Sequence, residues 1–509
     1  MESASEPPGN DPKVGGRIRG QPAPEYVDHI VRPTLRDELR HNFDALSINN
    51  LAHVVMLEQR KIIDRPTATA LLAAVHDIRE KGPESLPMDV DREDLYLNYE
   101  HAIALRAGSD VGGQIHTGRS RNDISATITA TRFRSAMISL IDSALKTRAV
   151  FLDTASDHVD TVMPGYTHLQ PAQPITLAHY LVGIETALDR DTARLLAALL
   201  RANRSPMGAA ALAGTGYPID RELMAELLGF DTVAVNTLDA VASRDYVLEG
   251  VAAAVVMGTT LARFAQDLYV WYTDEFALID FRDGISGTSS IMPQKKNPIV
   301  LEHIRGRTVH ALGAFTAAVA GVRSTPYTNT VDGNRESLRS TWDALEATRS
   351  AVELATLAVQ NMIVRADRML QRCESNFSTV TELADTLVRQ WHVSFRAAHE
   401  IVGGVVRTCL VRGLRATDID AELVREVARE HHHLDRPLTD GVVRLALDPR
   451  ANVAARNGLG GPAPDAVRAA IRSAQTTLES HRRELSAIVQ RLEQSEASLG
   501  RRVNALLPQ

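Results

Sequence analysis

Two arginines, two hydroxyl groups and a side-chain amide lie close together in one short polar segment. It runs from His116 to Asp123 and reads HTGRSRND. A guanidinium can bind a carboxylate through two parallel hydrogen bonds, and neighbouring glycines let backbone N–H groups approach a bound anion. The segment therefore predicts a carboxylate site, although a capped helix start with a surface ion pair would explain the same residues.

A histidine lies in a second polar segment, which runs from Gly165 to Pro174 and reads GYTHLQPAQP. The prolines restrict the turn around His168. This residue suits a general acid or base, because the unperturbed pKa of histidine is about 6.5. Histidines that are satisfied by local hydrogen bonds are commoner than catalytic ones, so this segment alone does not establish a catalytic role for His168.

The third polar segment runs from Gly287 to Pro298 and reads GTSSIMPQKKNP. Its hydroxyl groups are followed by two lysines and an asparagine. Such a loop can close over an anion, and it can place a serine where cations and N–H groups stabilise an alkoxide. A plain lysine-rich turn explains the loop less well, because Ile291 and Met292 are apolar for an exposed loop.

Long helices are expected to position these three segments. Helical apolar spacing covers residues 125–158, 177–200, 243–276, 301–322 and 338–364. Breaks rich in Gly, Pro, Ser or Thr fall at 108–118, 163–174, 204–217 and 281–298, so the polar segments occupy helix ends. Thr417 and Asp418 resemble a helix start, and residues 464–499 read as a charged, exposed helix. The pattern predicts an all-α protein with a long central bundle.

Composition excludes several classes of function. The 509 residues carry a net charge of −7, which does not predict a nucleic-acid partner. The most apolar stretch, Val251–Tyr272, contains Arg263 and Asp267 and therefore reads as a core helix, not a membrane span. Two cysteines and the run His431–His433 lack metal-ligand spacing, so no metal is expected. Residues 1–14 read as a disordered tail, and the protein is expected to be cytoplasmic.

Together the three segments resemble the signatures of the fumarase, aspartase and argininosuccinate lyase superfamily. The wording MPQKKNP in the third segment is similar to the argininosuccinate lyase form. Further similar stretches are ALAGT at 211–215 and AHEIVG at 398–403. The resemblance extends over nearly the whole chain from Gly15 onward, with the three signatures in the family's order.

The resemblance implies a three-domain, mostly helical fold. The expected ranges are an N-terminal helical domain over 15–121, a central long-helix bundle over 122–370 and a C-terminal helical domain over 371–509. It also implies a homotetramer in which the central helices form a twenty-helix core. Each active site would then combine one signature segment from each of three subunits.

The implied chemistry is a cofactor-free carbon–nitrogen elimination. A base removes the proton beside a carboxylate of an N-substituted aspartate, an aci-carboxylate dianion forms, and the amine departs to leave fumarate. The extra negative charge must be stabilised where it develops, because a proton beside a carboxylate is very weakly acidic. The expected catalytic residues are Ser289 as the base, with Ser290 as the alternative, Lys295 and Asn297 as stabilisers, His168 on the acid side and Glu302 as its carboxylate partner.

The resemblance also implies a set of substrate-binding residues. Ser120, Arg121, Asn122 and Thr167 are expected to hold the carboxylates of the succinyl half. The full expected set is Asn50, Tyr96, Ser120, Arg121, Asn122, Thr167, Gln170, Ser290, Met292, Asn297, Tyr327, Asp332 and Arg335.

Several positions on the amine side depart from argininosuccinate lyases. Tyr96 stands where a histidine is usual, Asn50 replaces a serine, Asp332 replaces a glutamine and Arg335 a lysine. The negative charge of Asp332 would suit an amine that carries a second cation. We therefore expect a leaving amine other than arginine, such as the diamine of the similar ethylenediamine-N,N'-disuccinate lyases, with argininosuccinate as the alternative substrate.

Three other classes explain less of the sequence. An inactive structural relative would not need Ser289, Lys295, Asn297 and His168 together. A fumarate hydratase would resemble a different form of the third segment. A plain helical scaffold accounts for the helices but not for three polar signatures in order.

Overall fold

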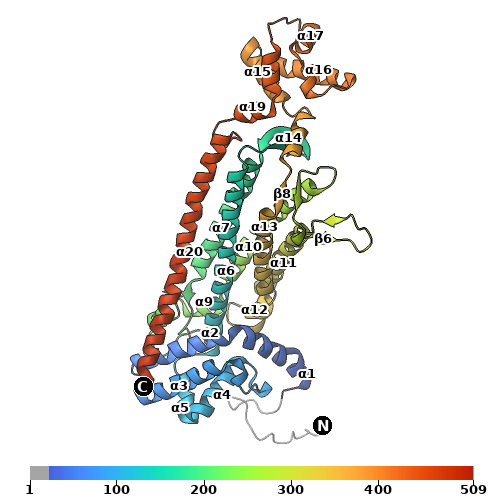
Figure 1. Cartoon of the computed structure of the whole chain (residues 1–509). Coiled ribbons are helices and arrows are strands. Elements are labelled where there is room, and N and C mark those ends of the chain that lie inside the picture. The colour runs from blue at the N-terminus through green and yellow to red at the C-terminus, as the bar shows by residue number, and fades with distance from the viewer. Residues whose placement is uncertain (1–21, 508–509) are drawn as a thin grey trace.

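The computed structural model describes residues 22–507, which form a long rod of helices (Figure 1). Helices from the N-terminal part of the chain gather at one end, long helices run along the middle, and a group of shorter helices lies at the other end. The tail expected at residues 1–14 lies outside the described residues.

The helices are α1 (Pro24–Tyr26), α2 (Arg32–Gln59), α3 (Arg65–Lys81), α4 (Leu95–Ala107), α5 (Ser109–Gly113), α6 (Arg121–Asp157), α7 (Leu177–Ala202), α8 (Arg221–Leu227), α9 (Thr237–Ala242), α10 (Asp245–Tyr272), α11 (Ile299–Arg323), α12 (Val331–Asn334), α13 (Thr341–Gln360), α14 (Ala366–Glu374), α15 (Val380–Trp391), α16 (Phe395–Arg412), α17 (Ala421–His432), α18 (Asp440–Leu447), α19 (Pro449–Ala454) and α20 (Pro464–Leu506). The strands are β1 (Val162–Thr167), β2 (Gln170–Thr176), β3 (Arg204–Ser205), β4 (Thr232–Val233), β5 (Ile279–Phe281), β6 (Gly287–Thr288), β7 (Lys296–Asn297) and β8 (Met362–Val364). Within residues 22–507 these strands make only two-stranded pairs, so the predicted all-α class is confirmed.

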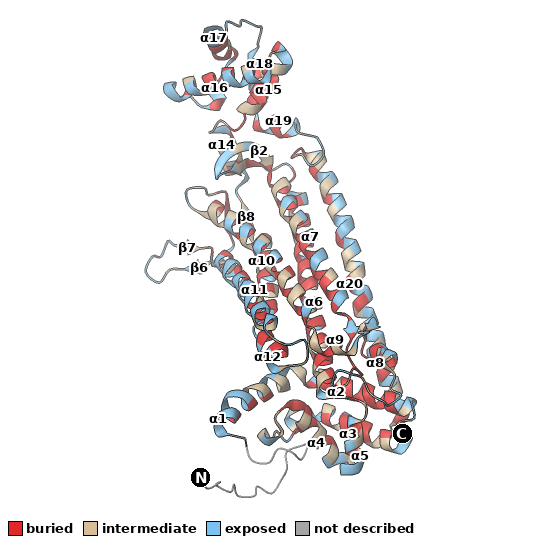
Figure 2. Ribbon diagram, turned by 180° about the vertical axis from the view of Figure 1, so that it is seen from behind, coloured by how far each residue is buried: buried red, intermediate tan, exposed pale blue. Residues whose placement is uncertain are grey.

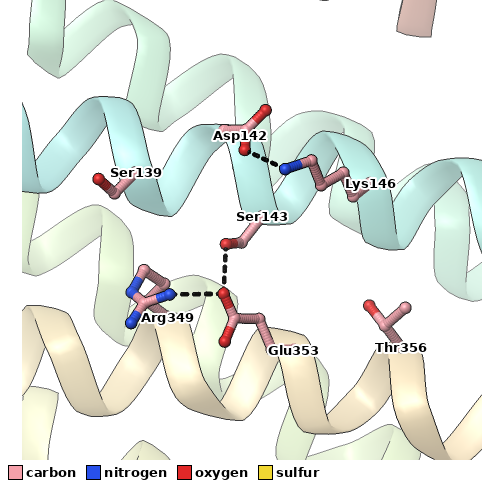
Figure 3. Close-up of a pocket in the computed structure, with 7 residues that line it drawn as sticks. All are labelled: Ser139, Asp142, Ser143, Lys146, Arg349, Glu353 and Thr356. Carbon is pink, nitrogen blue, oxygen red and sulfur yellow. Dashed lines mark hydrogen bonds and ion pairs between the residues drawn. The ribbon is translucent and has the colours of Figure 1, made fainter.

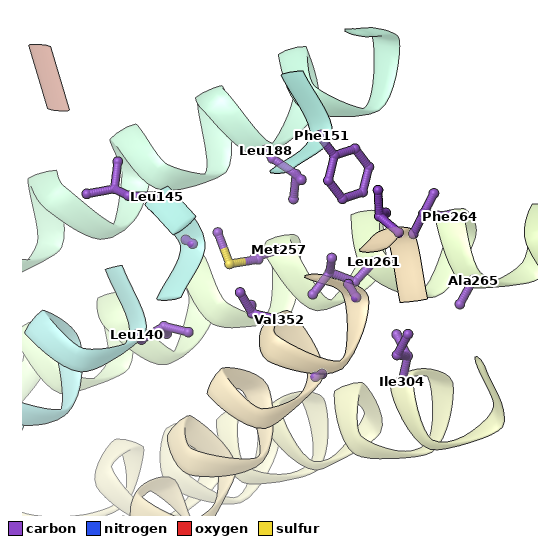
Figure 4. Packing of buried hydrophobic residues seen from close by; sticks show 14 of the residues in the cluster. Leu140, Leu145, Phe151, Leu188, Met257, Leu261, Phe264, Ala265, Ile304 and Val352 are labelled. Atoms are coloured by element: carbon purple, nitrogen blue, oxygen red, sulfur yellow. The ribbon is translucent and has the colours of Figure 1, made fainter. Parts of the chain in front are cut away.

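The central bundle consists of α6, α7, α10, α11 and α13, which pack against one another along their lengths. Apolar residues at helical spacing face inward and form one continuous core (Figure 4). Phe151 of α6 meets Phe264 of α10 with ring centroids 4.9 Å apart. Leu261 beside them is fully buried, and truncating such a residue typically costs about 2–5 kcal/mol.

Helix α10 is the one helix in the described chain that is long and apolar enough to cross a membrane. It packs against α7, α11 and α13 inside the bundle, and Asp267 on it accepts a hydrogen bond from Tyr180 of α7 (2.8 Å). Its apolar residues therefore pack in the core of the bundle, in agreement with the core helix that the charges within this stretch predicted.

Helix α20 corrects the prediction of an exposed tail helix. It runs back along the rod and packs against α6 and α7 (Figure 1). One face is buried, and its members are Val467, Ile471, Leu478, Leu485 and Ile488. The charged residues that suggested exposure occupy the other face, because an amphipathic helix of this length shows both characters at once.

A buried arginine ties α20 to the bundle. The Arg148 guanidinium, which is fully buried in α6, donates hydrogen bonds to Glu185 (2.8 Å) and Asp189 (2.5 Å) of α7. It also donates to His481 Nδ1 on α20 (2.8 Å). Breaking one partner of a buried pair leaves an uncompensated charge, so these contacts specify how the three helices dock.

Three large hydrophobic clusters lie along the rod. The first lies mainly among α2, α3 and α4, the second in the bundle and the third among α15 to α18. Helix α20 contributes to the bundle cluster and, through Leu499 and Val503, to the first one. The boundaries expected at 121/122 and 370/371 stay predictions. The helix start expected near Thr417 is displaced, because α17 begins at Ala421 with Asp420 as its N-cap.

Candidate active site

The first polar segment forms the beginning of α6. Ser120 is the N-cap residue, and its hydroxyl accepts a hydrogen bond from the Asn122 N–H (3.3 Å), while Asp123 accepts one from the Ser120 N–H (2.9 Å). This reciprocal capping fixes the backbone of the first turn. A helix N-terminus carries partial positive charge, so the capped turn is suited to bind a carboxylate.

The second oxygen of Asp123 attaches another loop to the same helix end. It accepts hydrogen bonds from the N–H groups of Gly208 (3.0 Å) and Ala210 (2.9 Å). Asp123 is fully buried, and burial raises its pKa to about 6 although these N–H groups oppose the shift. Sequence reasoning gave Asp123 no role. The spacing of an acidic residue three positions after Ser120 is the signal that could have revealed its capping half.

Two of the expected carboxylate binders are already engaged within the chain. The Asn122 side chain donates to the Ala211 carbonyl (2.9 Å) and accepts from the Asn329 amide (2.7 Å). Arg121 pairs with Asp94 (3.1 Å) and Glu93 (3.4 Å). The surface ion pair that was weighed against a carboxylate site is therefore present, and a substrate carboxylate must share or displace it.

The second polar segment forms the β1–β2 hairpin at the other end of α6. Thr167 pairs with Gln170, and the two residues between them, His168 and Leu169, both adopt left-handed backbone angles (φ 53° and 57°). A two-residue hairpin turn of this kind normally uses glycine or asparagine. The backbone of His168 and Leu169 is therefore strained in this turn. The turn is exposed, and so is His168 within it.

The third polar segment forms a loop between β6 and β7 that projects from the side of the bundle (Figure 2). The Ser289 hydroxyl oxygen accepts hydrogen bonds from the N–H groups of Met292 (3.0 Å) and Ile291 (3.4 Å). Within the described residues, the Ser290 hydroxyl and the Lys295 ammonium form no such side-chain bond. Asn297 donates to the Thr288 carbonyl (3.4 Å) at the base of the loop.

Lys296 anchors one side of this loop. Its ammonium lies 2.9 Å from Asp283 and 3.3 Å from Asp280, and it donates a hydrogen bond to the Phe281 carbonyl. The bond to Asp283 is the main cause that raises the pKa of Lys296. Sequence reasoning did not separate the two adjacent lysines. The structure assigns Lys296 to the scaffold and leaves Lys295 exposed.

Glu302 does not contact His168 within this chain. It is exposed near the start of α11 and accepts a hydrogen bond from Tyr269 (3.3 Å), whereas His168 lies on the β1–β2 hairpin. A pairing of the two side chains therefore needs the His168 of another copy.

The residues expected on the amine side form separate contacts, two of which involve the first segment. Asn50 is buried and accepts a hydrogen bond from Arg119 (2.8 Å), and the Tyr96 hydroxyl meets His116 Nδ1 at 2.5 Å. Tyr327 donates to Asp239 at the surface.

Asp332 lies in α12, and Arg335 directly follows this helix. Asp332 is exposed, and its pKa is lowered mainly by a hydrogen bond with the Thr330 side chain and by the Gly333 N–H. Arg335 pairs with Glu38 of α2 (3.3 Å). Neither side chain reaches Asn50 or Tyr96, so the chain does not close these residues into one pocket.

One chain does not bring the three segments together. The 37 residues of α6 separate Ser120 from the hairpin of His168, a span of roughly 55 Å at about 1.5 Å per residue. The β6–β7 loop projects from the bundle between these ends (Figure 1). Its Ile291 is 83% exposed, so the loop has an apolar tip without cover in the single chain.

The groove between α6 and α13 contains none of the expected site residues (Figure 3). Its charges are paired internally, because Lys146 contacts Asp142 (2.6 Å) and Arg349 contacts Glu353 (2.6 Å), which also accepts from Ser143 (2.9 Å). No group of three His, Cys, Asp or Glu side chains in residues 22–507 is arranged to hold a metal ion.

Comparisons with known proteins agree with the geometry of the fold. Residues 45–313 match the family model described as Lyase, and residues 377–454 match the model of the argininosuccinate lyase C-terminal region. Argininosuccinate lyase 1 of Shouchella clausii is 39% identical over 94% of this chain and 97% of its own length. The argininosuccinate lyase of Haloarcula marismortui is 40% identical over 92% of this chain and 91% of its own.

Solved structures lead to the same branch. An EDDS lyase crystallised with formate superposes with a TM-score of 0.85 and 33% identity, covering 96% of both chains. A 3-carboxy-cis,cis-muconate lactonizing enzyme from Pseudomonas putida shares the fold alone, at 19% identity and a TM-score of 0.70 over 89% of this chain and 99% of its own. The chain belongs to the argininosuccinate lyase branch of the fumarase and aspartase superfamily, and it is a fumarate-forming carbon–nitrogen lyase.

Proposed function

We propose that this enzyme reversibly eliminates an amine from an N-succinyl amine by a serine-based anti-elimination. The observation that carries the proposal is the environment of Ser289, whose oxygen faces two backbone N–H groups. Fixed donors aimed at an oxygen stabilise its anion and lower its proton affinity, so a serine alkoxide becomes accessible as a base. Ser290 has no comparable support in the described chain, so Ser289 is the better candidate.

The remaining roles follow from where charge develops. Lys295 and Asn297 lie in the same loop as Ser289 and would stabilise the aci-carboxylate once the loop closes over the substrate. His168, paired with Glu302, would supply the proton to the leaving nitrogen directly or through water. Ser120, Asn122 and Thr167 would hold the succinyl carboxylates, with Arg121 released from Glu93 or Asp94 to assist.

We propose a homotetramer with shared active sites, because one chain separates these roles along its length. The outer face of α11 supports this proposal. Val309 and Leu312 on it are 63% and 54% exposed, which is unusual for the middle of a long apolar helix. Covering this face with other copies would bury it and would bring the loop of one copy to the helix end of another.

Mixing two inactive variants tests the sharing of sites. If Ser289 and His168 of one active site come from different copies, mixed assemblies of Ser289→Ala and His168→Asn chains contain some intact sites. Activity should then return after the two proteins are unfolded and refolded together. Absence of recovery, with each variant alone forming the wild-type assembly, would contradict shared sites.

Two leaving amines are in competition. The Asp332 carboxylate lies three residues from Asn329, which contacts Asn122, and an exposed carboxylate there favours an amine with a second cation, as in ethylenediamine-N,N'-disuccinate. The similarity to an EDDS lyase over 96% of the chain supports the same candidate. The argininosuccinate lyase relatives at 36–40% identity support arginine as the alternative.

The loss of fumarate absorbance in the near ultraviolet distinguishes a diamine from arginine as the leaving amine. The purified protein is incubated with fumarate and a single amine, first arginine and then ethylenediamine. Consumption only with diamines supports the first candidate, and consumption with arginine identifies an ordinary argininosuccinate lyase. If neither amine is consumed and Ser289→Ala behaves like the wild type, the proposed elimination is wrong for these amines. A cytoplasmic location stays a prediction.

A further inference from the structure

Three asparagine side chains form a directional chain of hydrogen bonds at the beginning of α6. The Asn334 amide donates to Asn329, the Asn329 amide donates to Asn122 (2.7 Å), and the Asn122 amide donates to the Ala211 carbonyl (2.9 Å). A backbone carbonyl can only accept, so Ala211 requires Asn122 to point its nitrogen towards it. Each amide upstream is then fixed in the same sense.

This arrangement leaves Asn122 with one amide hydrogen uncommitted. Its nitrogen carries two hydrogens, and one of them is bound to the Ala211 carbonyl. Its oxygen is occupied by the Asn329 amide, which prevents the side chain from flipping. The remaining hydrogen is a donor of fixed direction beside the positive end of α6, where an anion is favoured.

The segment that supplies Asn329 is itself well held. Thr330 caps α12 by accepting from the Gly333 N–H (3.3 Å), and Ser337 donates to the Gly333 carbonyl (2.6 Å). Asn334 is 8% exposed, so the far end of the amide chain is buried. The contact between Asn329 and Asn122 joins residues 207 positions apart, and no sequence signature indicates it.

We propose that Asn329 is a positioning residue that orients Asn122 towards a carboxylate of the succinyl half, and that Asn334 supports it from behind. The inference rests on the proposed function, because that function gives Asn122 its ligand. Asn329 acts through Asn122 and needs no contact with substrate. Fumarate, which contains both carboxylates and no amine, is therefore the appropriate probe.

The first experiment measures fumarate binding by titration calorimetry to the full-length wild type and to Asn329→Leu, which keeps the branched shape and adds no charge. Loss of a donor to a carboxylate binder should weaken fumarate binding about tenfold. The KM for the amine in the addition direction should change less than about twofold. The matched control is Asn361→Leu. Asn361 is a half-buried asparagine at the end of α13 that donates to its own helix (2.9 Å), and the fumarate affinity of this variant should equal that of the wild type.

A double-mutant cycle separates positioning from a general structural role. If Asn329 acts only through Asn122, then Asn122→Leu combined with Asn329→Leu should bind fumarate no more weakly than Asn122→Leu alone. Asn329→Gln, which keeps an amide donor, should recover part of the affinity and covers the case in which Asn329→Leu does not fold. Fully additive losses, or a loss shared equally by fumarate and the amine, would overturn the inference.

The two levels of the argument fail in different ways. Wild-type protein that neither binds nor consumes fumarate would refute the proposed function and the inference with it. If the wild type binds fumarate and Asn329→Leu binds it with the same affinity, the inference about Asn329 is wrong, while the proposed function stands.

Discussion

The beginning of α6 and the β6–β7 loop are both polar signature segments, yet the chain supports them very differently. At the helix end, a capping box, the buried Asp123 and the Asn329 contact hold the backbone of the first turn and the Asn122 side chain in place. The loop has its Ser289 turn and the Lys296 anchor, while Ile291, Met292 and Lys295 are exposed.

This difference separates binding from chemistry. Groups that hold a carboxylate in substrate and product alike gain from a fixed geometry, because no ordering cost is paid on binding. A group that must strip a weakly acidic proton gains from a loop that closes and excludes water only when substrate is present. In the proposed mechanism, a single chain therefore builds the binding end, and the chemical loop depends on closure or on cover by other copies.

The largest expected effect is the loss of the base. Ser289→Ala should lower kcat by roughly 1000-fold, within the range of about 10²–10⁴ for removal of a general base. Its melting temperature should match the wild type, because the loop adds little to the core. The assay is fumarate release followed by near-ultraviolet absorbance.

Ser290→Ala is the matched comparison within the same loop. It should lower kcat at most about tenfold, since its hydroxyl lacks the two backbone donors that face Ser289. A larger loss for Ser290→Ala than for Ser289→Ala would reverse the assignment of the base.

The next effect tests the rigid helix end. Burial raises the pKa of Asp123 to about 6, above its unfolded value of 3.8, so the folded state holds its proton more tightly. The stability that Asp123 contributes is fully present below about pH 4 and is lost as the pH rises through about 6. At about 1.4 kcal/mol per pKa unit, the change is on the order of 3 kcal/mol.

Denaturant unfolding of the wild type and Asp123→Asn at pH 4 and pH 7 measures this change. The asparagine has no proton to lose, so the wild type should lose stability relative to the variant as the pH rises. A relative gain would mean that the Ser120, Gly208 and Ala210 N–H groups outweigh burial and hold the Asp123 pKa below its ordinary value.

A smaller effect is expected at the anchor of the loop. Lys296→Met removes the contacts to Asp280, Asp283 and the Phe281 carbonyl, so the loop should reach its closed form less often. We expect kcat/KM to fall about 10- to 100-fold, because small misplacements of catalytic groups cause losses of this size. The melting temperature should not change. Steady-state kinetics measure this effect.

Lys146→Met is the control for Lys296→Met, because Lys146 is also a lysine in an ion pair (2.6 Å to Asp142) but lies on α6 away from the loop. It should retain wild-type kinetics. Equal losses in both variants would show that the anchor has no specific role.

The helices and the family were predictable from the sequence for a clear reason. Apolar spacing is local, so α6, α7, α10 and α11 were found within a few residues of their ends. The three signatures are also local, and each falls in one loop, one hairpin or one helix start. The chemistry of each segment could therefore be read before its position was known.

Contacts between distant parts of the chain were not predictable. The contact between Asn329 and Asn122 joins a loop to the first turn of α6 without a shared pattern. The buried face of α20 was masked by its charged residues. Adjacent lysines cannot be told apart by spacing, so only the fold separates the anchor Lys296 from the exposed Lys295. The pairing of His168 with Glu302 would involve another copy and stays a prediction.

The smallest expected effect concerns the choice of amine at the edge of the rigid end. Asp332 is exposed, and a solvent-exposed charge contributes little to binding, so Asp332→Gln should lower the kcat/KM ratio of ethylenediamine over arginine by only roughly two- to fivefold. The effect should shrink at high salt, because exposed charges are screened beyond a Debye length of about 8 Å at physiological ionic strength. Asp435→Asn, an exposed carboxylate in the C-terminal region, is the control and should leave the ratio unchanged. An unchanged ratio in Asp332→Gln would remove the charge argument for a diamine and favour arginine, because the relatives named for argininosuccinate would then be the stronger guide to the amine.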